Sequence, residues 1–248
     1  LKCMGFPCNY YFFRLINRCY NYTTNNVSVT IIISIKQHFV VLVGIFDLDA
    51  MTHKFEIIQK EECYQGFFTL TRLHIKHTLY AGGWSEPVVR ELLDRGHAVA
   101  VLLYDPLLDN VVFVEQFRVG ALDDEKGAWL LELVAGMIEN GETHHDVAKR
   151  ECIEEAGCEI SCIEEICYYY PSPGGTNEMI GLFCARVNSS SIGGIYGVED
   201  ENEDILVHVM SFEQSVAELY DGRINSASTI IAMQWLILNK DKLVQKWT

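Results

Sequence analysis

The stretch Gly136-Met-Ile-Glu-Asn-Gly-Glu142-Thr-His-His-Asp-Val-Ala-Lys-Arg150-Glu151-Cys-Ile-Glu154-Glu155-Ala-Gly157 decides how this sequence is interpreted. Thr143, followed three residues later by Asp146, is typical of a capping box at the start of a helix. Gly157 is typical of the residue that ends one. We therefore expect a helix from His144 to Ala156.

Three carboxylates share one side of this helix. With Val147 at 0° on a helical wheel, Glu154, Glu151 and Glu155 fall at about 340°, 40° and 80°. Like charges three and four positions apart repel, so this group would be mildly destabilising on its own. A bound Mg²⁺ or Mn²⁺ would make the same group of carboxylates stabilising, because both ions bind carboxylates together with substrate phosphates. The alternative is a solvated acidic face. An adjacent apolar stripe should pack on a sheet; it consists of Ala148, Cys152 and Ala156.

The stretch resembles the Nudix box of the Nudix hydrolases. All of the fixed positions of that pattern are present; they are Gly136, Glu142, Arg150, Glu151, Glu154, Glu155 and Gly157. Cys152 and Cys158 occupy two slots where larger aliphatic residues are usual. Further segments are similar to the bacterial ADP-ribose pyrophosphatases; they are Tyr64–Phe68, Val89–His97, Glu115–Arg118, Leu131–Gly136, Ser172–Thr176 and Glu199–Glu203. The resemblance covers about 55–247 and leaves 1–50 unmatched.

The order of strands and helices indicates an α/β fold with a mixed sheet. Two further helices fit Phe212–Tyr220 and Ala227–Lys246. The expected strands are His97–Tyr104, Val111–Phe117, Trp129–Val134, Glu159–Tyr169, Met179–Val187 and Leu206–Met210. The resemblance implies the Nudix α/β/α sandwich. We expect an extension at 1–50, a strand-rich segment at 51–95 and the hydrolase domain at 96–248.

Residues 55–95 have strand character, with aromatic and β-branched residues concentrated in Phe67–Ile75. About forty residues of strand make a poor independent core, so this segment should pack on something larger. We expect it to be an antiparallel segment that builds a homodimer.

Residues 1–50 are rich in Phe, Tyr, Asn and Ile and show no helical period. Val27–Phe46 is the candidate for a membrane span, but Lys36-Gln37-His38 leaves apolar runs too short for a bilayer core of ~30 Å. We expect this segment to be translated upstream sequence and the working protein to begin near Met51. The alternative is a membrane anchor.

Composition excludes several classes of protein. The chain has 248 residues, is 49% hydrophobic and carries a net charge of −15, so it is neither disordered nor fibrous. The net negative charge of the chain argues against nucleic acid as a partner, because binding of nucleic acid needs a basic protein surface. Nine cysteines without zinc-site spacing indicate buried thiols in a reducing compartment, and we expect a cytoplasmic protein without a membrane partner.

The resemblance implies a metal site. Glu151 and Glu155, with the backbone carbonyl of Ala135, would bind Mg²⁺, or Mn²⁺ in its place, and Glu154 would be a further or water-mediated ligand. Arg150 would hold the box carboxylates by a bidentate pair.

The acidic run 199–204 reads as a loop. There the resemblance implies a metal ligand at Glu203 and the general base at Glu201, since a carboxylate near several cations can deprotonate a water. The alternative is a solvated acidic loop.

The resemblance also implies substrate contacts. Phe67 and Phe68 would stack on the adenine from the other subunit, although by themselves they read as strand core. Ser172, in a turn typical of Ser-Pro-Gly-Gly, would be a polar contact. Ribose and diphosphate oxygens would be held by Arg90, Glu91, Arg95 and Arg118, which by themselves read as surface charges.

The expected reaction is Mg²⁺-dependent hydrolysis of the diphosphate of ADP-ribose to AMP and ribose 5-phosphate. One alternative substrate is another nucleoside-diphosphate sugar such as GDP-mannose. A non-catalytic nucleotide-binding regulator is a further alternative, which the intact set of box carboxylates disfavours.

Overall fold

A computed structural model describes residues 53–198, 200 and 202–248 in full, and the backbone of 18–24, 27–33 and 42–47. The chain divides into two compact units, one made of Leu1–Glu61 with Arg72–Arg90 and the other of Glu62–Thr71 with Glu91–Thr248. Across the described residues, no helix combines the length and the apolar character needed to cross a membrane. The expected start near Met51 falls on residues 48–52, outside the described residues.

The N-terminal part is built from strands, which the sequence predicted for residues 55–95 and not for residues 1–50. β1 (Arg18–Thr24), β2 (Val27–Ile33) and β3 (Leu42–Asp47) form an antiparallel sheet in that order. A second three-stranded sheet has the order β4 (Phe55–Gln65), β5 (Thr69–His77) and β6 (Val88–Asp94). The prediction that Phe67 and Phe68 lie in a strand is wrong, because the backbone N–H of Gly66 donates to the carbonyl of Phe68 at 3.0 Å and closes a turn there.

The second unit contains an eight-stranded mixed sheet. Its path is β11-β12-β7-β8-β14-β13, with β10 paired to β7 and β9 paired to β8. The β12–β7 pair is parallel and the other pairs are antiparallel. The strands are β7 (Ala98–Asp105), β8 (Asn110–Phe117), β9 (Trp129–Glu132), β10 (Val134–Met137), β11 (Ser161–Tyr169), β12 (Ile180–Arg186), β13 (Gly194–Tyr196) and β14 (Ile205–Ser211).

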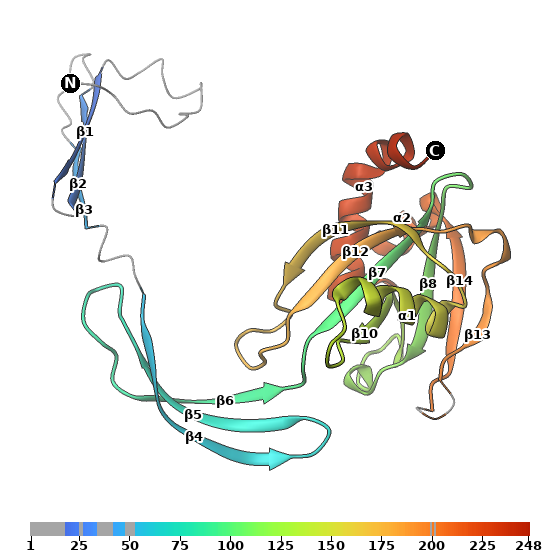
Figure 1. The fold of residues 1–248 in the computed structure, drawn as a ribbon, viewed down its shortest axis with the longest axis horizontal. Coiled ribbons are helices and arrows are strands. Elements are labelled where there is room, and N and C mark those ends of the chain that lie inside the picture. The colour runs from blue at the N-terminus through green and yellow to red at the C-terminus, as the bar shows by residue number, and fades with distance from the viewer. Residues whose placement is uncertain (1–17, 25–26, 34–41, 48–52, 199, 201) are drawn as a thin grey trace. The chain divides into compact units, whose positions relative to one another are not determined.

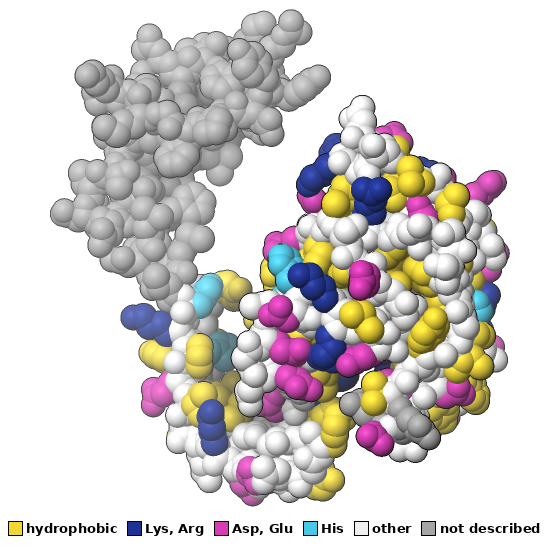
Figure 2. All heavy atoms as spheres, turned by 45° about the vertical axis from the view of Figure 1, so that its right-hand side comes forward, with side chains coloured by type: hydrophobic (Ala, Val, Ile, Leu, Met, Phe, Trp, Pro, Cys, Tyr) yellow, Lys and Arg dark blue, Asp and Glu magenta, His cyan; other side chains and the backbone are white. Residues whose placement is uncertain are grey.

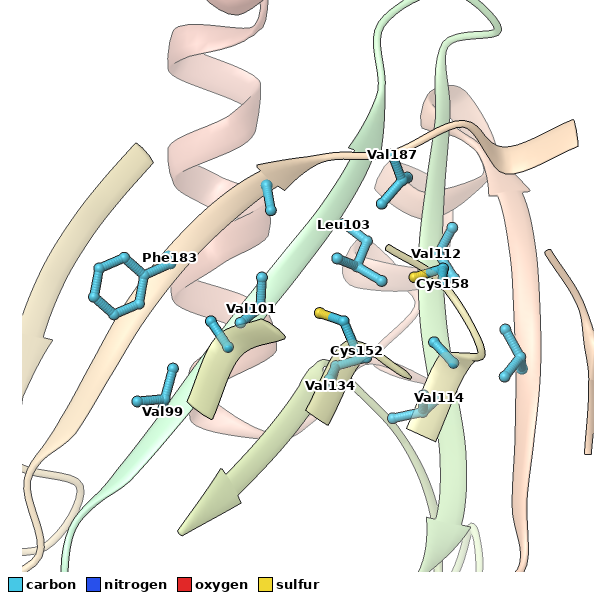
Figure 3. Close-up of a cluster of buried hydrophobic side chains, with 14 of the residues drawn as sticks. Val99, Val101, Leu103, Val112, Val114, Val134, Cys152, Cys158, Phe183 and Val187 are labelled. Carbon is cyan, nitrogen blue, oxygen red and sulfur yellow. The ribbon is translucent and has the colours of Figure 1, made fainter. Parts of the chain in front are cut away.

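Helices cover both faces of this sheet, which confirms the predicted α/β/α sandwich. Figure 1 shows α1 (His144–Ala156) on one face and α3 (Ala227–Trp247) on the other, where α2 (Phe212–Tyr220) also packs. The alternation of side chains along β7 separates two cores. Val99, Val101 and Leu103 pack with α1, as Figure 3 shows, whereas the intervening residues pack with α3. Each fully buried aliphatic side chain contributes roughly 1.5–3 kcal/mol.

The ends of α1 are those that its sequence predicts. The backbone N–H of Thr143 donates to Oδ2 of Asp146 at 3.0 Å, and the N–H of Asp146 donates to Oγ1 of Thr143 at 3.3 Å, completing the capping box. Such a cap is worth about 1 kcal/mol. Gly157 ends the helix with φ 58°, and a β-carbon there would lie 2.2 Å from the ring of Tyr196. The position therefore requires glycine for both its conformation and its packing.

One predicted strand is interrupted. Trp129–Val134 was expected to be continuous, but β9 ends at Glu132 and pairs with β8, whereas β10 begins at Val134 and pairs with β7. The chain changes partners at Leu133, which is buried. The apolar run extends through both segments, so hydrophobicity alone does not reveal the change. The short β13 was not predicted because its sequence is rich in glycine.

Candidate active site

The carboxylates of α1 differ in burial according to their distance from the apolar stripe. Glu155, next to the stripe, is 2% exposed. The side chain of Glu151 is 12% exposed and that of Glu154, on the far side, 35%. The acidic side of the helix therefore extends from the protein interior at Glu155 to the solvent-exposed surface at Glu154.

Glu155 is fixed by two donors from the sheet. The backbone N–H of Ala135 in β10 donates to Oε2 at 2.9 Å. Nε2 of Gln116, a buried residue of β8, donates to Oε1 at 3.4 Å. A buried carboxylate is costly unless it is hydrogen-bonded, so these donors hold the side chain in one orientation.

Arg150 gathers the other box carboxylates. Its Nε and one terminal nitrogen donate to the two oxygens of Glu142 at 2.9 and 3.1 Å, a bidentate pair. Its other terminal nitrogen donates to Glu151 at 2.6 Å and to Glu154 at 3.0 Å. The guanidinium also reaches the carbonyl of Met137 at 3.2 Å. The planar, always charged arginine suits this geometry, and these carboxylates raise the pKa of Arg150 above its usual range.

The acidic loop is attached to the end of α1. The N–H of Gly197 donates to the carbonyl of Glu154 at 3.2 Å. Within the loop, the N–H of Val198 donates to Oε2 of Glu203 at 3.1 Å. These bonds place the charge of Glu203 close enough to affect the box carboxylates. The predicted base Glu201 lies outside the described residues.

The electrostatics of this cluster favour a cation. Burial raises the pKa of Glu155 to about 8 and that of Glu151 to about 7, and the charge of Glu203 adds to both increases. Arg150 opposes the rise at Glu151, and Arg118 opposes it at Glu155. Oxygen donors of this kind are the ligands that Mg²⁺ and Mn²⁺ take. No ready-made group of three or more metal ligands occurs among the described residues, consistent with protein donors holding these oxygens.

Positive charges lie next to the acidic ones. Nε of Arg118, which follows β8, donates to Oε2 of Glu132 in β9 at 2.6 Å. Figure 2 shows Asp and Glu side chains beside Lys and Arg side chains on one face of the molecule. Local cationic side chains can therefore attract an anionic ligand although the protein as a whole is acidic.

A second group of residues surrounds Arg95. The guanidinium of Arg95 lies 5.4 Å from the ring centroid of Phe68, a cation–π contact, and 3.4 Å from a carboxylate oxygen of Glu178, which is buried. The N–H of Leu93 donates to the carbonyl of Gly175 at 2.8 Å. This bond joins the segment that carries Arg95 to the turn that begins at Ser172.

Comparisons with known proteins match the part of the chain that carries this cluster. The family model described as "NUDIX domain" matches residues 94–230. That range includes α1, Arg150 and the whole carboxylate cluster.

The chain belongs to the NUDIX family.

The chain is also similar to individual family members. It is 45% identical to the ADP-ribose pyrophosphatase of Escherichia coli (strain K12) over 192 residues, which is 77% of this chain and 92% of the relative. It is 29% identical to the GDP-mannose pyrophosphatase of Yersinia enterocolitica, over 75% of this chain and 96% of the relative. A crystal structure of an "ADP compounds hydrolase" matches with a TM-score of 0.56 at 19% identity, over 75% of this chain and 96% of that one, which supports the Nudix fold.

The described part of this Nudix chain brings together most of the predicted metal-site residues. The N–H of Ala135 contacts Glu155, while Glu151 and Glu203 lie within electrostatic reach of that residue. Glu154 joins the cluster through Arg150. The role of each as a ligand stays a prediction.

The predicted substrate contacts are more dispersed. Arg118 lies near the Nudix carboxylates, whereas Ser172 is exposed in its turn. Phe67 is 85% exposed and makes an edge-to-face contact with Phe68, with ring centroids 4.9 Å apart. The remaining predicted contacts lie in β6; they are Arg90, which belongs to the first compact unit, and Glu91. All these roles stay predictions.

The sequence interpretation gave no role to two residues that contact the site, Gln116 and Glu132. Both occur in segments that resemble Nudix relatives, and both are polar residues within apolar strands. A buried polar group requires a partner, so this pattern is the signal that could have revealed them.

Proposed function

We propose that this Nudix protein hydrolyses the diphosphate of ADP-ribose to AMP and ribose 5-phosphate. The observation that carries the proposal is the cluster of Glu151, Glu155 and Glu203 beside Arg118, in a chain 45% identical to an ADP-ribose pyrophosphatase over nearly the whole of that relative. Carboxylates for a cation and an arginine for phosphate are the groups that diphosphate hydrolysis needs.

Mg²⁺ is the cation that we propose for this cluster. Glu151, Glu155 and Glu203 would hold it, together with the carbonyl of Ala135 and with Glu154 as a further or water-mediated ligand. When bound, Mg²⁺ would neutralise phosphate charge and acidify a nearby water. Mn²⁺ has the same preference for oxygen ligands and could replace it.

The chain's own residues would perform the remaining steps. Arg118 binds a phosphate oxygen and opposes the charge that accumulates during attack. Glu201 takes the proton from the attacking water as the new phosphorus–oxygen bond forms. The bond between phosphorus and the bridging oxygen then breaks and releases the two monophosphates. Arg150 keeps Glu151 and Glu154 in place throughout.

We further propose that the working form is a homodimer, in which the partner supplies an aromatic platform for the adenine. Every residue of β4 is exposed, including Phe55, Ile57 and Ile58. Phe67 is also exposed, and stacking on a base requires only an aromatic face. Apolar surface of this extent is typical of an interface. Light scattering coupled to size exclusion should give twice the chain mass, and a single chain mass would contradict the dimer.

We also assign the protein to a reducing compartment such as the cytoplasm. Cys152, Cys158 and Cys184 are free thiols buried within the protein. Buried thiols behave as small apolar residues. Labelling of the protein inside intact cells with a thiol reagent should find them reduced, and extensive disulfide formation would contradict the assignment.

A substrate panel tests the proposed reaction. The full chain, and a chain beginning at Met51, should be assayed with ADP-ribose, GDP-mannose and a dinucleoside polyphosphate, with separation of the nucleotide products. We expect the highest kcat/KM on ADP-ribose, with AMP as the nucleotide product. Preference for GDP-mannose would favour the alternative substrate, whereas tight nucleotide binding without turnover would favour a regulator.

A further inference from the structure

The ion pair between Arg118 and Glu132 is unequally buried. The side chain of Glu132 is 17% exposed and that of Arg118 is 42% exposed. The bond uses Nε of Arg118, at 2.6 Å from Oε2 of Glu132. Among the described residues, neither terminal nitrogen of Arg118 has a protein acceptor. The glutamate is thus an anchor within the sheet, and the outer part of the guanidinium reaches towards solvent.

The strands place this pair on the face that carries the metal-site candidates. Glu132 is paired across the sheet with Val114, which packs with α1. Cross-strand partners share a face of the sheet. Gln116, between Val114 and Arg118 in the chain, contacts Glu155 directly. The charge of Arg118 accordingly reaches Glu155 and opposes the rise in its pKa.

An arginine in this position can interfere with the site that it serves. Its side chain is long and always charged, and its charge already reaches Glu155, which is electrostatically coupled to Glu151. If the guanidinium turned towards these carboxylates, its N–H groups would occupy the oxygen lone pairs that a cation needs. Arg150 also donates to Oε1 of Glu151, but both oxygens of Glu142 fix its guanidinium in that one arrangement.

We propose that Glu132 is a positioning residue, which holds Arg118 away from the metal-binding carboxylates and leaves its terminal nitrogens to bind the diphosphate. The inference rests on the proposed function for the identity of the substrate. It goes further by giving Glu132 a role that depends on Arg118. Removing the glutamate should therefore weaken metal binding only while the arginine is present.

Binding of Mn²⁺ to the metal-free full chain, measured by electron paramagnetic resonance without nucleotide, tests this dependence. Glu132→Gln should weaken Mn²⁺ binding by about tenfold, as loss of such a supporting contact typically does. The double variant Glu132→Gln/Arg118→Gln should recover at least the wild-type affinity, because the competing guanidinium is gone. Glu164→Gln, which removes a distant pair with Lys246, is the matched control and should leave the affinity unchanged.

Two results would overturn the proposal. One is wild-type Mn²⁺ affinity in Glu132→Gln. The other is a double variant that binds as weakly as Glu132→Gln, since the glutamate would then act through folding rather than through Arg118.

Steady-state kinetics at saturating Mg²⁺ provide an independent measurement. Glu132→Gln should raise KM for ADP-ribose, and the double variant should be no more active than Arg118→Gln although its metal site is restored. Recovery of turnover in the double variant would contradict the role of Arg118. If the wild type did not hydrolyse ADP-ribose, the proposed function would fail, but the Mn²⁺ measurement would still decide the role of Glu132.

Discussion

Gly136 and Glu151 are packed so closely that a β-carbon added at Gly136 would lie 1.6 Å from Oε1 of Glu151. A β-carbon is fixed to the backbone and cannot rotate away from such an overlap. The side chain of Glu151 would therefore have to leave its position. The absence of a side chain at Gly136 is therefore what allows α1 to present Glu151 against β10.

Gly136→Ala should reduce kcat/KM for ADP-ribose by about 100-fold, since a displacement of about 1 Å in a catalytic group can cost that much. The protein should remain folded by circular dichroism. Gly120→Ala is the matched control, because its β-carbon meets no atom within 4 Å. Equal activity of the two variants would show that the position of Glu151 is not critical.

Arg150→Lys should lower the free energy of unfolding by about 2 kcal/mol, because an ammonium group cannot reproduce charge-assisted bonds to several carboxylates. Chemical denaturation measures this change. Arg223→Lys provides the comparison, since Arg223 is 43% exposed and its carboxylate contacts are both 3.6 Å long. Its cost should stay within about 0.5 kcal/mol. Similar costs for the two variants would argue against the role of Arg150 in holding the cluster.

Asp105 should make stability depend on pH. Burial by itself raises its pKa, but bonds from Ser189, Leu107 and Leu108 outweigh burial and lower the pKa below 3.8. A lowered pKa stabilises the fold above the unfolded value and loses that contribution as the pH falls through the folded value. Asp105→Asn should cost about 2 kcal/mol at pH 7.

That difference between the wild type and Asp105→Asn should shrink below pH 3.8. Urea titrations of both proteins across this range provide the measurement. A difference that stays constant with pH would show that the charge of Asp105 contributes nothing.

Glu155→Gln should lose most of its activity while remaining folded. The glutamine oxygen can still accept from the N–H of Ala135, and above about pH 8 the change also removes a buried charge next to Glu151. We therefore expect a thermal midpoint equal to or above that of the metal-free wild type, together with a large fall in kcat. Unfolding of the variant would instead indicate a structural role for Glu155.

The order of burial of the box glutamates could be predicted from the helical period alone. The wheel placed Glu155 nearest to the apolar stripe and Glu154 farthest from it, and their burial follows that order. The capping box and Gly157 defined both ends of α1. Local signals of this kind succeed because they depend on residues only a few positions apart.

Contacts between distant strands could not be predicted in the same way. Nothing near Glu132 in the sequence indicates that it pairs with Arg118, or that Gln116 contacts Glu155 from another strand. The change of partner at Leu133 brings Ala135 to Glu155, and it depends on which strands lie beside each other. Such pairings follow from the topology of the whole sheet rather than from local spacing.

The dependence of turnover on a divalent cation is the most direct test of the cluster. Initial rates of ADP-ribose hydrolysis should be measured for the wild-type chain in excess EDTA, and again after Mg²⁺ is added beyond the chelator. We predict that the chelator abolishes AMP formation and that Mg²⁺ restores it. Hydrolysis that continues at its full rate in EDTA would contradict the assignment of these carboxylates to a cation.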